Sequence, residues 1–252
     1  GKKVMIWAKE ETLSREEIKE IQTARLRETV ERVYHTVEPY RKKMDEAGLK
    51  PEDIRGLEDL HNLPFTTKQD MRDNYPFGLF AVPKKDLIRI HASSGTTGKP
   101  TVVGYTRKDL DVWSECVCRI ACMGGAQPDE IAQICFGYGM FTGALGLHYG
   151  LERLGAAIVP SSTGNTEKQL MFMKDFGTTL LIATPSYALR IAEVAEQMGI
   201  HPQCDLSMRT ALVGSELMTE AMRQEMYKAW GDHMNITQNY GMSELMGPGV
   251  SG

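Results

Sequence analysis

The chain has 252 residues, of which 42% are hydrophobic and 25% are charged, a composition typical of globular proteins. This composition excludes a disordered chain, a collagen-like repeat and a small protein held together by disulfides. The formal net charge of −4 does not indicate a nucleic-acid or membrane partner. The apolar runs are too short to cross a bilayer, and no signal peptide is predicted. The five cysteines are therefore expected to be free thiols in a cytoplasmic protein.

The first third of the chain is predicted to be helical. Ser14 followed three residues later by Glu17 forms a capping box, and apolar residues then recur at helical spacing. Pro39 should end or kink this helix, because proline lacks the N–H that a helix interior requires. Thr67 is a candidate N-cap for a further short helix. We therefore assign 1–86 to a helical amino-terminal region.

From residue 87 onward the pattern changes to alternating strands and helices. Several of the strands are continuous apolar runs, which is typical of a parallel sheet covered by helices on both faces. The sequence therefore predicts an α/β fold for 87–252, with a largely parallel sheet, flanking helices and the helical segment before it. The final residues, 247–252, have the composition of a loop. The expected strands are 87–90, 131–136, 156–160, 179–183, 209–213 and 235–238. The expected helices are 108–123, 142–154, 166–176, 186–198 and 219–230.

Chemistry in such folds gathers in the loops that follow the carboxyl ends of strands. The loop 93–100 reads Ser-Ser-Gly-Thr-Thr-Gly-Lys-Pro. Its glycines let backbone N–H groups turn toward an anion, and its hydroxyls and lysine add donors and positive charge, as a polyphosphate requires. It is not a Walker A loop, because only two residues separate Gly95 from Gly98 and Pro100 replaces the magnesium-binding hydroxyl. An ordinary polar turn is the alternative.

Three further loops follow expected strands. The loop 137–143 misses a dinucleotide-binding fingerprint by one residue, and its Tyr138 and Phe141 either offer a flat aromatic surface or pack the loop. The loop 214–216 reads Gly-Ser-Glu and is either part of a site or an ordinary turn at the start of a helix. The loop 239–244 lacks the final glycine of a nucleophile elbow, which disfavours a serine hydrolase.

Two other features are interpreted as structural. Cys118 and Cys122 can share one helical face, but Cys116 lies on another face and no histidine stands near to complete a zinc site. The three cysteines are therefore predicted to be core or half-buried thiols. A lone histidine on a helix is more often structural than catalytic, so His148 is not included among the candidate site residues.

Taken together and in this order, the four loops resemble the adenylate-forming superfamily, which contains acyl-CoA synthetases, luciferases and the adenylation domains of peptide synthetases. Residues 93–100 match the phosphate loop of that superfamily almost letter for letter, and 240–244 matches its Y-G-x-[ST]-E motif. The segments 63–68, 136–143 and 244–249 resemble the phenylacetate-CoA ligase family in particular. The resemblance covers essentially the whole chain. It implies that the α/β region is the ATP-binding part of the large domain of such an enzyme.

The resemblance implies two half-reactions. A carboxylate attacks the α-phosphate of ATP to give an acyl-adenylate and pyrophosphate, and the thiol of coenzyme A then displaces AMP. Glu244 would bind Mg²⁺, Ser243 would contact the α-phosphate, and Lys99 would support the phosphate loop. The ATP-binding residues of that loop would be Ser93, Ser94, Gly95, Thr96, Thr97 and Gly98.

The resemblance also assigns the adenine and acid pockets. Tyr240 would stack on adenine and Asn239 would hydrogen-bond its edge, with Gly214, Ser215, Glu216 and Gly241 completing the nucleotide site. The acid pocket would be built from Tyr138, Gly139, Phe141 and the strand end near Ile236. An aromatic, apolar slot suits an arylacetic acid, phenylacetate first.

Several alternatives remain open within and outside this family. Ser215 stands where the ligase family commonly has alanine, so benzoate and indoleacetate also remain candidate acids. A synthetase that adenylylates a deazaflavin cofactor is a close relative. A non-catalytic nucleotide-binding module is the alternative hypothesis from a different class of protein. A homodimer is compatible with this branch of the superfamily.

The superfamily continues well past the Y-G-x-[ST]-E motif. It adds an aspartate for the ribose hydroxyls, a hinge, and a small mobile domain that carries a lysine for adenylation. The 252 residues contain none of these parts. The chain is therefore expected to be a fragment that binds nucleotide weakly and catalyses poorly by itself.

Overall fold

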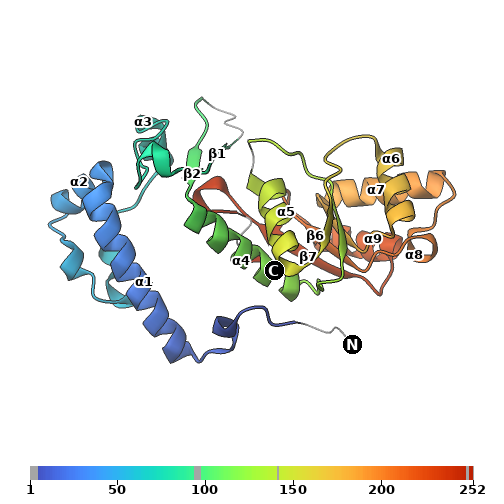
Figure 1. Ribbon diagram of the computed structural model, residues 1–252, viewed down its shortest axis with the longest axis horizontal. Helices are drawn as coiled ribbons and strands as arrows, with labels where there is room; N and C mark the ends of the chain where they lie inside the picture. The colour runs from blue at the N-terminus through green and yellow to red at the C-terminus, as the bar shows by residue number, and fades with distance from the viewer. Residues whose placement is uncertain (1–4, 94–97, 141, 248–249, 252) are drawn as a thin grey trace. The chain divides into compact units, whose positions relative to one another are not determined.

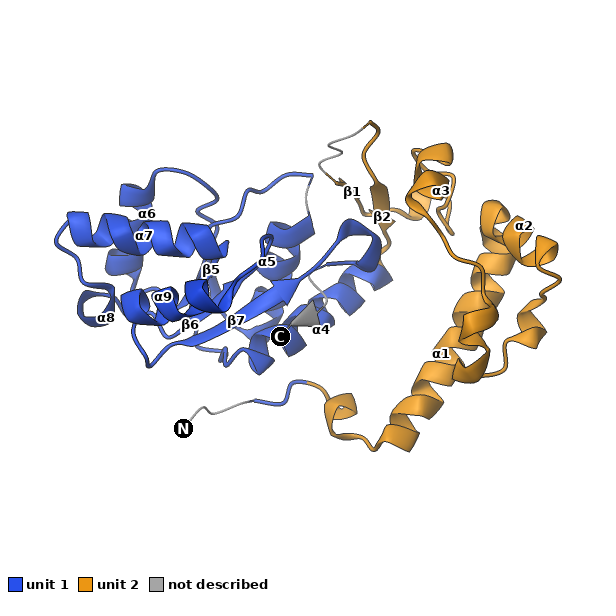
Figure 2. Ribbon diagram, turned by 180° about the vertical axis from the view of Figure 1, so that it is seen from behind, with its two compact units in different colours: residues 1–7, 108–252 blue, residues 8–107 orange. Residues whose placement is uncertain are grey.

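The computed structural model describes residues 5–93, 98–140, 142–247 and 250–251. The chain forms two compact units (Figure 2). The helical unit comprises 8–107, and the α/β unit comprises 1–7 together with 108–252. The division falls near residue 107, later than the 86 expected from the sequence, because a β-hairpin lies within the helical unit.

The first α-helix of the helical unit, α1, begins where the capping box predicts. The Ser14 hydroxyl accepts from the backbone N–H of Glu17, and the Glu17 carboxylate accepts from the N–H of Ser14, at 3.2 and 2.8 Å. Two otherwise unpaired N–H groups are thereby satisfied at the start of α1. Its helices are α1 Arg15–Thr36, α2 Glu38–Glu46 and α3 Lys68–Asp73, with 3-10 turns at Lys9–Thr12, Pro51–Asp53, Leu57–Asn62 and Lys84–Asp86.

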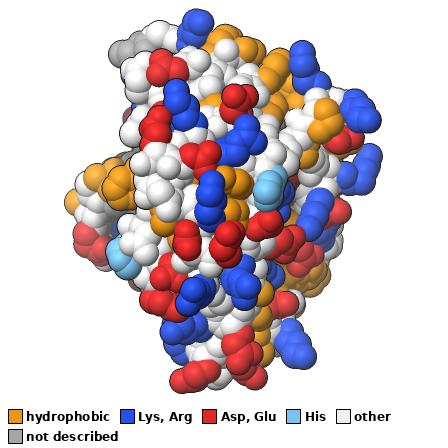
Figure 3. Space-filling view, turned by 90° about the vertical axis from the view of Figure 1, so that its left-hand side faces the viewer, with side chains coloured by type: hydrophobic (Ala, Val, Ile, Leu, Met, Phe, Trp, Pro, Cys, Tyr) orange, Lys and Arg blue, Asp and Glu red, His pale blue; other side chains and the backbone are white. Residues whose placement is uncertain are grey.

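The helical unit has a small core and a mixed surface. Val30, Met44 and Ile54 are almost fully buried and join α1 and α2 to the turn that follows them. Seen from the side on which α1 and α2 lie, acidic and basic side chains are interspersed over the surface (Figure 3). Within the described residues, no helix combines the length and apolar character needed to cross a membrane.

The hairpin of the helical unit corrects one expectation. The strand expected at 87–90 is β1 Arg89–Ala92, and it pairs antiparallel with β2 Val102–Tyr105 instead of joining the parallel sheet. The sequence did not predict β2. Its four residues carry no alternation of polar and apolar side chains, and their strand conformation depends on the partner strand.

The sheet of the α/β unit is largely parallel, as predicted. Its strands are β3 Ile131–Ile134, β4 Ala157–Val159, β5 Leu180–Ala183, β6 Thr210–Val213 and β7 Asn235–Tyr240, in the spatial order β4-β3-β5-β6-β7. One expectation for the end of the chain is wrong. The segment 247–252 was expected to be loop, but Val250–Ser251 forms β8, which pairs antiparallel with the end of β7.

Helices cover both faces of this sheet (Figure 1). One face packs against a core that includes Met173, Ile191 and Trp230, and the other face carries Leu212 and Thr237 toward the end of α4. The first face is covered by α6 Thr166–Phe176, α7 Pro185–Gln197 and α9 Glu220–Trp230, with a short α8 at Pro202–Asp205. The second face is covered by α4 Arg107–Met123 and α5 Thr142–Leu154. Cys118 and Cys122 are fully buried in α4, as expected for core thiols.

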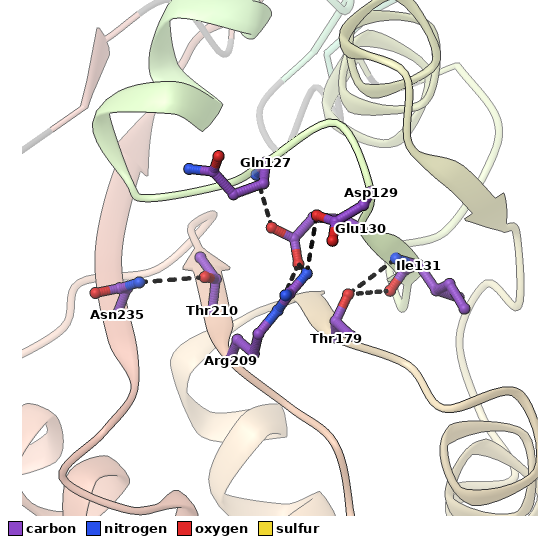
Figure 4. A network of polar contacts seen from close by, with 8 residues as sticks. All are labelled: Gln127, Asp129, Glu130, Ile131, Thr179, Arg209, Thr210 and Asn235. Carbon is purple, nitrogen blue, oxygen red and sulfur yellow. Dashed lines mark hydrogen bonds and ion pairs between the residues drawn. The ribbon is translucent and has the colours of Figure 1, made fainter. Parts of the chain in front are cut away.

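A polar network closes the amino-terminal edge of the sheet (Figure 4). The guanidinium of Arg209, just before β6, donates to the Glu130 carboxylate at 2.7 and 3.2 Å and to Asp129 at 3.2 Å. The Glu130 side chain is 1% exposed, and its other oxygen accepts from the backbone N–H of Gln127 at 2.7 Å. Burial opposes ionisation of Arg209, but the hydrogen bond and charge of Glu130 raise the pKa of the guanidinium.

We expect Arg209→Met to destabilise the protein by about 2 to 3 kcal/mol, because it leaves a buried carboxylate with one partner fewer. Arg190→Met is the matched control, since Arg190 pairs with the exposed Glu193 on the same helix. Its loss should stay within about 0.5 kcal/mol. Urea denaturation measures the free energy of unfolding of both variants. Equal losses of stability in the two variants would contradict the role given to Arg209.

Candidate functional site

The order of strands in the α/β unit defines where a ligand site is expected. The chain runs outward from β3 to β4 and then returns past β3 to β5, so the order reverses between β3 and β5. In open α/β sheets, ligands bind beyond the carboxyl ends of the strands at such a reversal. The loops that follow β3, β5, β6 and β7 all leave the sheet at this edge.

The loops after β6 and β7 lie against one another. A side-chain carbon at Gly214 would come within 3.0 Å of the backbone oxygen of Asn239, so a larger residue would force the loops apart. Ser215 follows in the left-handed conformation with φ of +71°, which L-residues rarely adopt. The structure thus brings predicted residues of the two loops together, and the left-handed conformation of Ser215 turns the chain within the loop after β6.

Glu216 ties this edge together through protein contacts. Its carboxylate accepts from the backbone N–H of Ser186 at 2.6 Å, in the first turn of α7, where a negative charge is favourable. Its backbone oxygen accepts from the Gln238 amide at 3.2 Å. Thr184, the N-cap of α7, accepts from the N–H of Tyr187 at 3.1 Å. The side chain of Glu216 therefore joins the loops after β5 and β6, while its backbone is held by β7.

The end of β7 carries a buried amide next to an exposed aromatic ring. Asn239 is 6% exposed, and within the described residues its side-chain oxygen is buried without a hydrogen-bond partner. A buried acceptor without a partner is unfavourable, so a ligand donor would stabilise it. The next residue, Tyr240, is 59% exposed and donates its hydroxyl hydrogen to the Met242 sulfur at 3.5 Å.

The candidate metal ligand follows directly. Ser243 and Glu244 begin a 3-10 turn, Ser243–Leu245, and both are partly exposed. The backbone of Gly241 fills the space where a side chain at Gly247 would stand, so the glycine at 247 allows the turn to fold back. Among the residues that the structure describes, no three His, Cys, Asp or Glu side chains gather into a metal site. One carboxylate suits Mg²⁺, which binds through one or two carboxylates and the oxygens of a phosphate.

The loop after β3 carries a second polar arrangement. The Tyr138 hydroxyl lies 3.0 Å from Nδ1 of His148, and Nε2 of His148 lies 2.7 Å from the Glu152 carboxylate. Burial and, after it, the charge of Glu152 raise the pKa of Tyr138 to about 12. Sequence reasoning set His148 aside. The only signal available was the spacing of His148 and Glu152, one helical turn apart.

The other predicted acid-pocket residues are placed differently. Gly139 follows Tyr138 at the carboxyl edge and is exposed, and Phe141 lies outside the described residues. Ile236 is the second residue of β7 and is 2% exposed within the core that packs against α7 and α9. The structure therefore places Ile236 inside the sheet core and not at the carboxyl edge.

The predicted phosphate loop belongs to the helical unit, where it connects β1 to β2. Residues 94–97 of this loop lie outside the described residues. At one end, the Ser93 hydroxyl accepts from the N–H of Thr101 at 2.9 Å. At the other end, Gly98 has φ of +96°, a conformation that favours glycine. The Lys99 ammonium lies 4.9 Å from the ring centre of Tyr75.

The solved structures similar to this chain show its fold. An open conformation of 2-hydroxyisobutyryl-CoA ligase, in complex with 2-HIB-AMP and CoA, superposes with a TM-score of 0.88 at 24% identity and covers 96% of this chain. The match covers 57% of that protein. A second structure of the same ligase, in its thioesterification state, gives a TM-score of 0.89.

Curated relatives are more similar in sequence. The phenylacetate-coenzyme A ligases of Thermus thermophilus and Escherichia coli are 50% and 48% identical to the chain over 241 residues. The matches cover 96% of this chain but only 54% and 55% of those proteins. The chain thus spans about half the length of the curated relatives it matches. The family model described as AMP-binding enzyme matches residues 1–251, and the chain therefore belongs to the family of AMP-binding enzymes.

Proposed function

We propose that the polypeptide containing this chain activates an aryl carboxylic acid, phenylacetate first, by adenylation with ATP. Coenzyme A then takes the acyl group and AMP leaves. The observation that carries this proposal is the identity of 46 to 50% with four curated phenylacetate-coenzyme A ligases, over 96% of the chain. A cytoplasmic location and a homodimer, both expected from the sequence, remain predictions.

The end of β7 supports the adenine part of this proposal. The buried side-chain oxygen of Asn239 lacks a partner among the described residues, and the adenine amino group is a donor of matching polarity. The exposed ring of Tyr240 offers a stacking surface one residue further along. The nucleotide pocket is completed, in this proposal, by Gly214, Ser215, Glu216 and Gly241.

Charge neutralisation is the requirement for the first half-reaction, because a carboxylate attacks an anionic phosphate. In the proposed site, Ser94, Gly95, Thr96, Thr97 and Gly98 hold the outer phosphates, with Ser93 and Lys99 supporting their loop. Ser243 contacts the α-phosphate, and Glu244 holds Mg²⁺. The metal ion supplies positive charge to the phosphate oxygens when bound.

The loop after β3 supports an acid site at the strand reversal. Tyr138 and Gly139 belong to the loop that follows β3, at the edge where ligands bind in such folds. Phe141 belongs to the same proposed pocket. Ile236 lies in the core below this edge, so its contribution is to support β7.

Acid-dependent pyrophosphate release tests the proposal. The protein encoded by the complete gene should release pyrophosphate from ATP and Mg²⁺ when phenylacetate is added, and form a thioester when coenzyme A is also present. Benzoate, indoleacetate and a deazaflavin acid form the comparison panel. ATP binding without release for any acid would favour a non-catalytic nucleotide-binding module, and release only with the deazaflavin acid would overturn the proposed substrate class.

We expect Glu244→Gln to lower the rate of pyrophosphate release by at least about tenfold and to increase the Mg²⁺ concentration required. The amide keeps the shape of the side chain but removes the charge that attracts the metal ion. The thermal midpoint should stay unchanged. Glu225→Gln, an exposed acid on α9, is the control and should leave activity unaltered. Unchanged Mg²⁺ dependence in Glu244→Gln would refute the metal role.

Glu216 is expected to act by holding its loop. Glu216→Gln retains an oxygen that accepts from Ser186, whereas Glu216→Ala removes the acceptor and should cost roughly 1 kcal/mol of stability. The KM for ATP should therefore rise severalfold in the alanine variant and much less in the glutamine variant. Calorimetry and kinetics measure the two effects. Equal kinetic losses without a loss of stability would instead indicate a direct contact between the Glu216 charge and the ligand.

A further inference from the structure

A hydrogen-bonded chain of three side chains leads from the surface of α5 to the loop after β3. The Glu152 carboxylate lies 2.7 Å from Nε2 of His148, and Nδ1 of His148 lies 3.0 Å from the Tyr138 hydroxyl. The rings of Tyr138 and His148 meet edge to face, with centres 5.7 Å apart and planes at 88°. The ring of Tyr149 lies against the imidazole, with centres 5.0 Å apart.

When the imidazole of His148 is neutral, the chemistry of these groups fixes the direction of the hydrogen bonds. A carboxylate only accepts, so Nε2 of His148 must carry the hydrogen that points to Glu152. In a neutral imidazole, Nδ1 then has no hydrogen and is an acceptor. The Tyr138 hydroxyl therefore donates its single hydrogen to His148, and it has none left for a ligand.

The position of His148 is set by the packing of α5. A side-chain carbon at Gly146 would collide with the ring of Trp113, and one at Gly150 would collide with Val117, both on α4. These two glycines therefore mark the side of α5 that touches α4. His148 lies midway between them in the sequence, about 200° around the helix from each. It points away from α4, and its side chain is only 20% exposed.

We propose that His148 is a positioning residue that holds the hydroxyl of Tyr138, so that the acid pocket receives the aromatic ring of Tyr138 and not an O–H donor. This inference rests on the proposed function, because it assigns Tyr138 to the pocket for the acid. Glu152 acts one step further out by fixing which imidazole nitrogen carries the hydrogen.

The arrangement has a consequence for the substrate. The carboxylate of the acid obtains no hydrogen bond from Tyr138, so this residue recognises the apolar ring of the acid. Aromatic rings pack favourably edge to face or offset, in an orientation that a fixed phenol can define. The pocket therefore favours an aryl acid whose ring carries no hydrogen-bond acceptor opposite Tyr138, because the Tyr138 oxygen can still accept but has no hydrogen to donate.

A double-mutant cycle on the full-length protein tests the inference. Tyr138→Phe removes the donor and His148→Leu removes the acceptor. Each should raise the KM for phenylacetate by roughly tenfold, while the KM for ATP stays within about twofold. The double variant should show about the same tenfold rise, because both changes break one bond. His148→Asn, which can place an oxygen near the position of Nδ1, should restore most of the affinity.

The control variant is His201→Leu. His201 also pairs with a glutamate, since its Nδ1 lies 2.9 Å from Glu196, but it stands after the end of α7 and 65% of its side chain is exposed. The KM of the His201→Leu variant for phenylacetate should change by less than about twofold. Multiplying effects in the double variant, or equal changes in the KM for ATP and for the acid, would overturn the inference.

Nitrogen NMR of histidine-labelled protein tests the bond without any assay of activity. At about pH 8, where an ordinary imidazole is neutral, His148 should show a hydrogen on Nε2 and none on Nδ1. The signal is identified by its loss in His148→Asn. A hydrogen on Nδ1 would overturn the inference. Wild-type protein without acid-dependent pyrophosphate release would instead overturn the proposed function, and the NMR result would then stand by itself.

Discussion

Burial of the parallel sheet on both faces is the constraint on which the rest of the α/β unit depends. All four residues of β5 and all four of β6 are buried, so these strands offer no side chain to solvent. Polar groups that bind or react are therefore confined to the ends of the strands. At the amino-terminal edge, Arg209 and Glu130 satisfy one another. At the carboxyl edge, Asn239 keeps an acceptor without a partner among the described residues.

Gln133 shows what the same constraint demands of a polar side chain inside the sheet. It lies fully buried in β3, where its amide donates to the backbone and side-chain oxygens of Gln169 at 3.0 and 2.7 Å and accepts from Thr178 at 2.9 Å. Gln169 in turn donates to the backbone oxygen of Ser162, which has φ of +60°. A satisfied buried network is rigid, so this one holds the loop after β4 from inside the sheet.

Whether a feature could be predicted from the sequence depends on how far apart along the chain the interacting residues lie. The start of α1 was predictable because Ser14 and Glu17 satisfy one another within a single turn. β2 and β8 were missed because such short strands are stabilised by their partners and not by a pattern of their own. The candidate site residues were proposed because most of them end or follow a predicted strand, and they remain a proposal, but their contacts could not be predicted. Glu216 meets Ser186 across 30 residues, and His148 meets Tyr138 across a loop and half a helix.

The carboxyl edge separates the groups that hold the loops from the groups that remain open to a ligand. Glu216 and His148 use their polar side-chain atoms in hydrogen bonds to other parts of the protein. At the end of β7, Asn239 has a buried acceptor and Tyr240 has an exposed ring. When a loop becomes ordered only on ligand binding, the entropy lost by the loop lowers the affinity for the ligand. Because Glu216 and His148 already hold the described parts of their loops, the interactions of a bound ligand remain available to orient its reacting atoms.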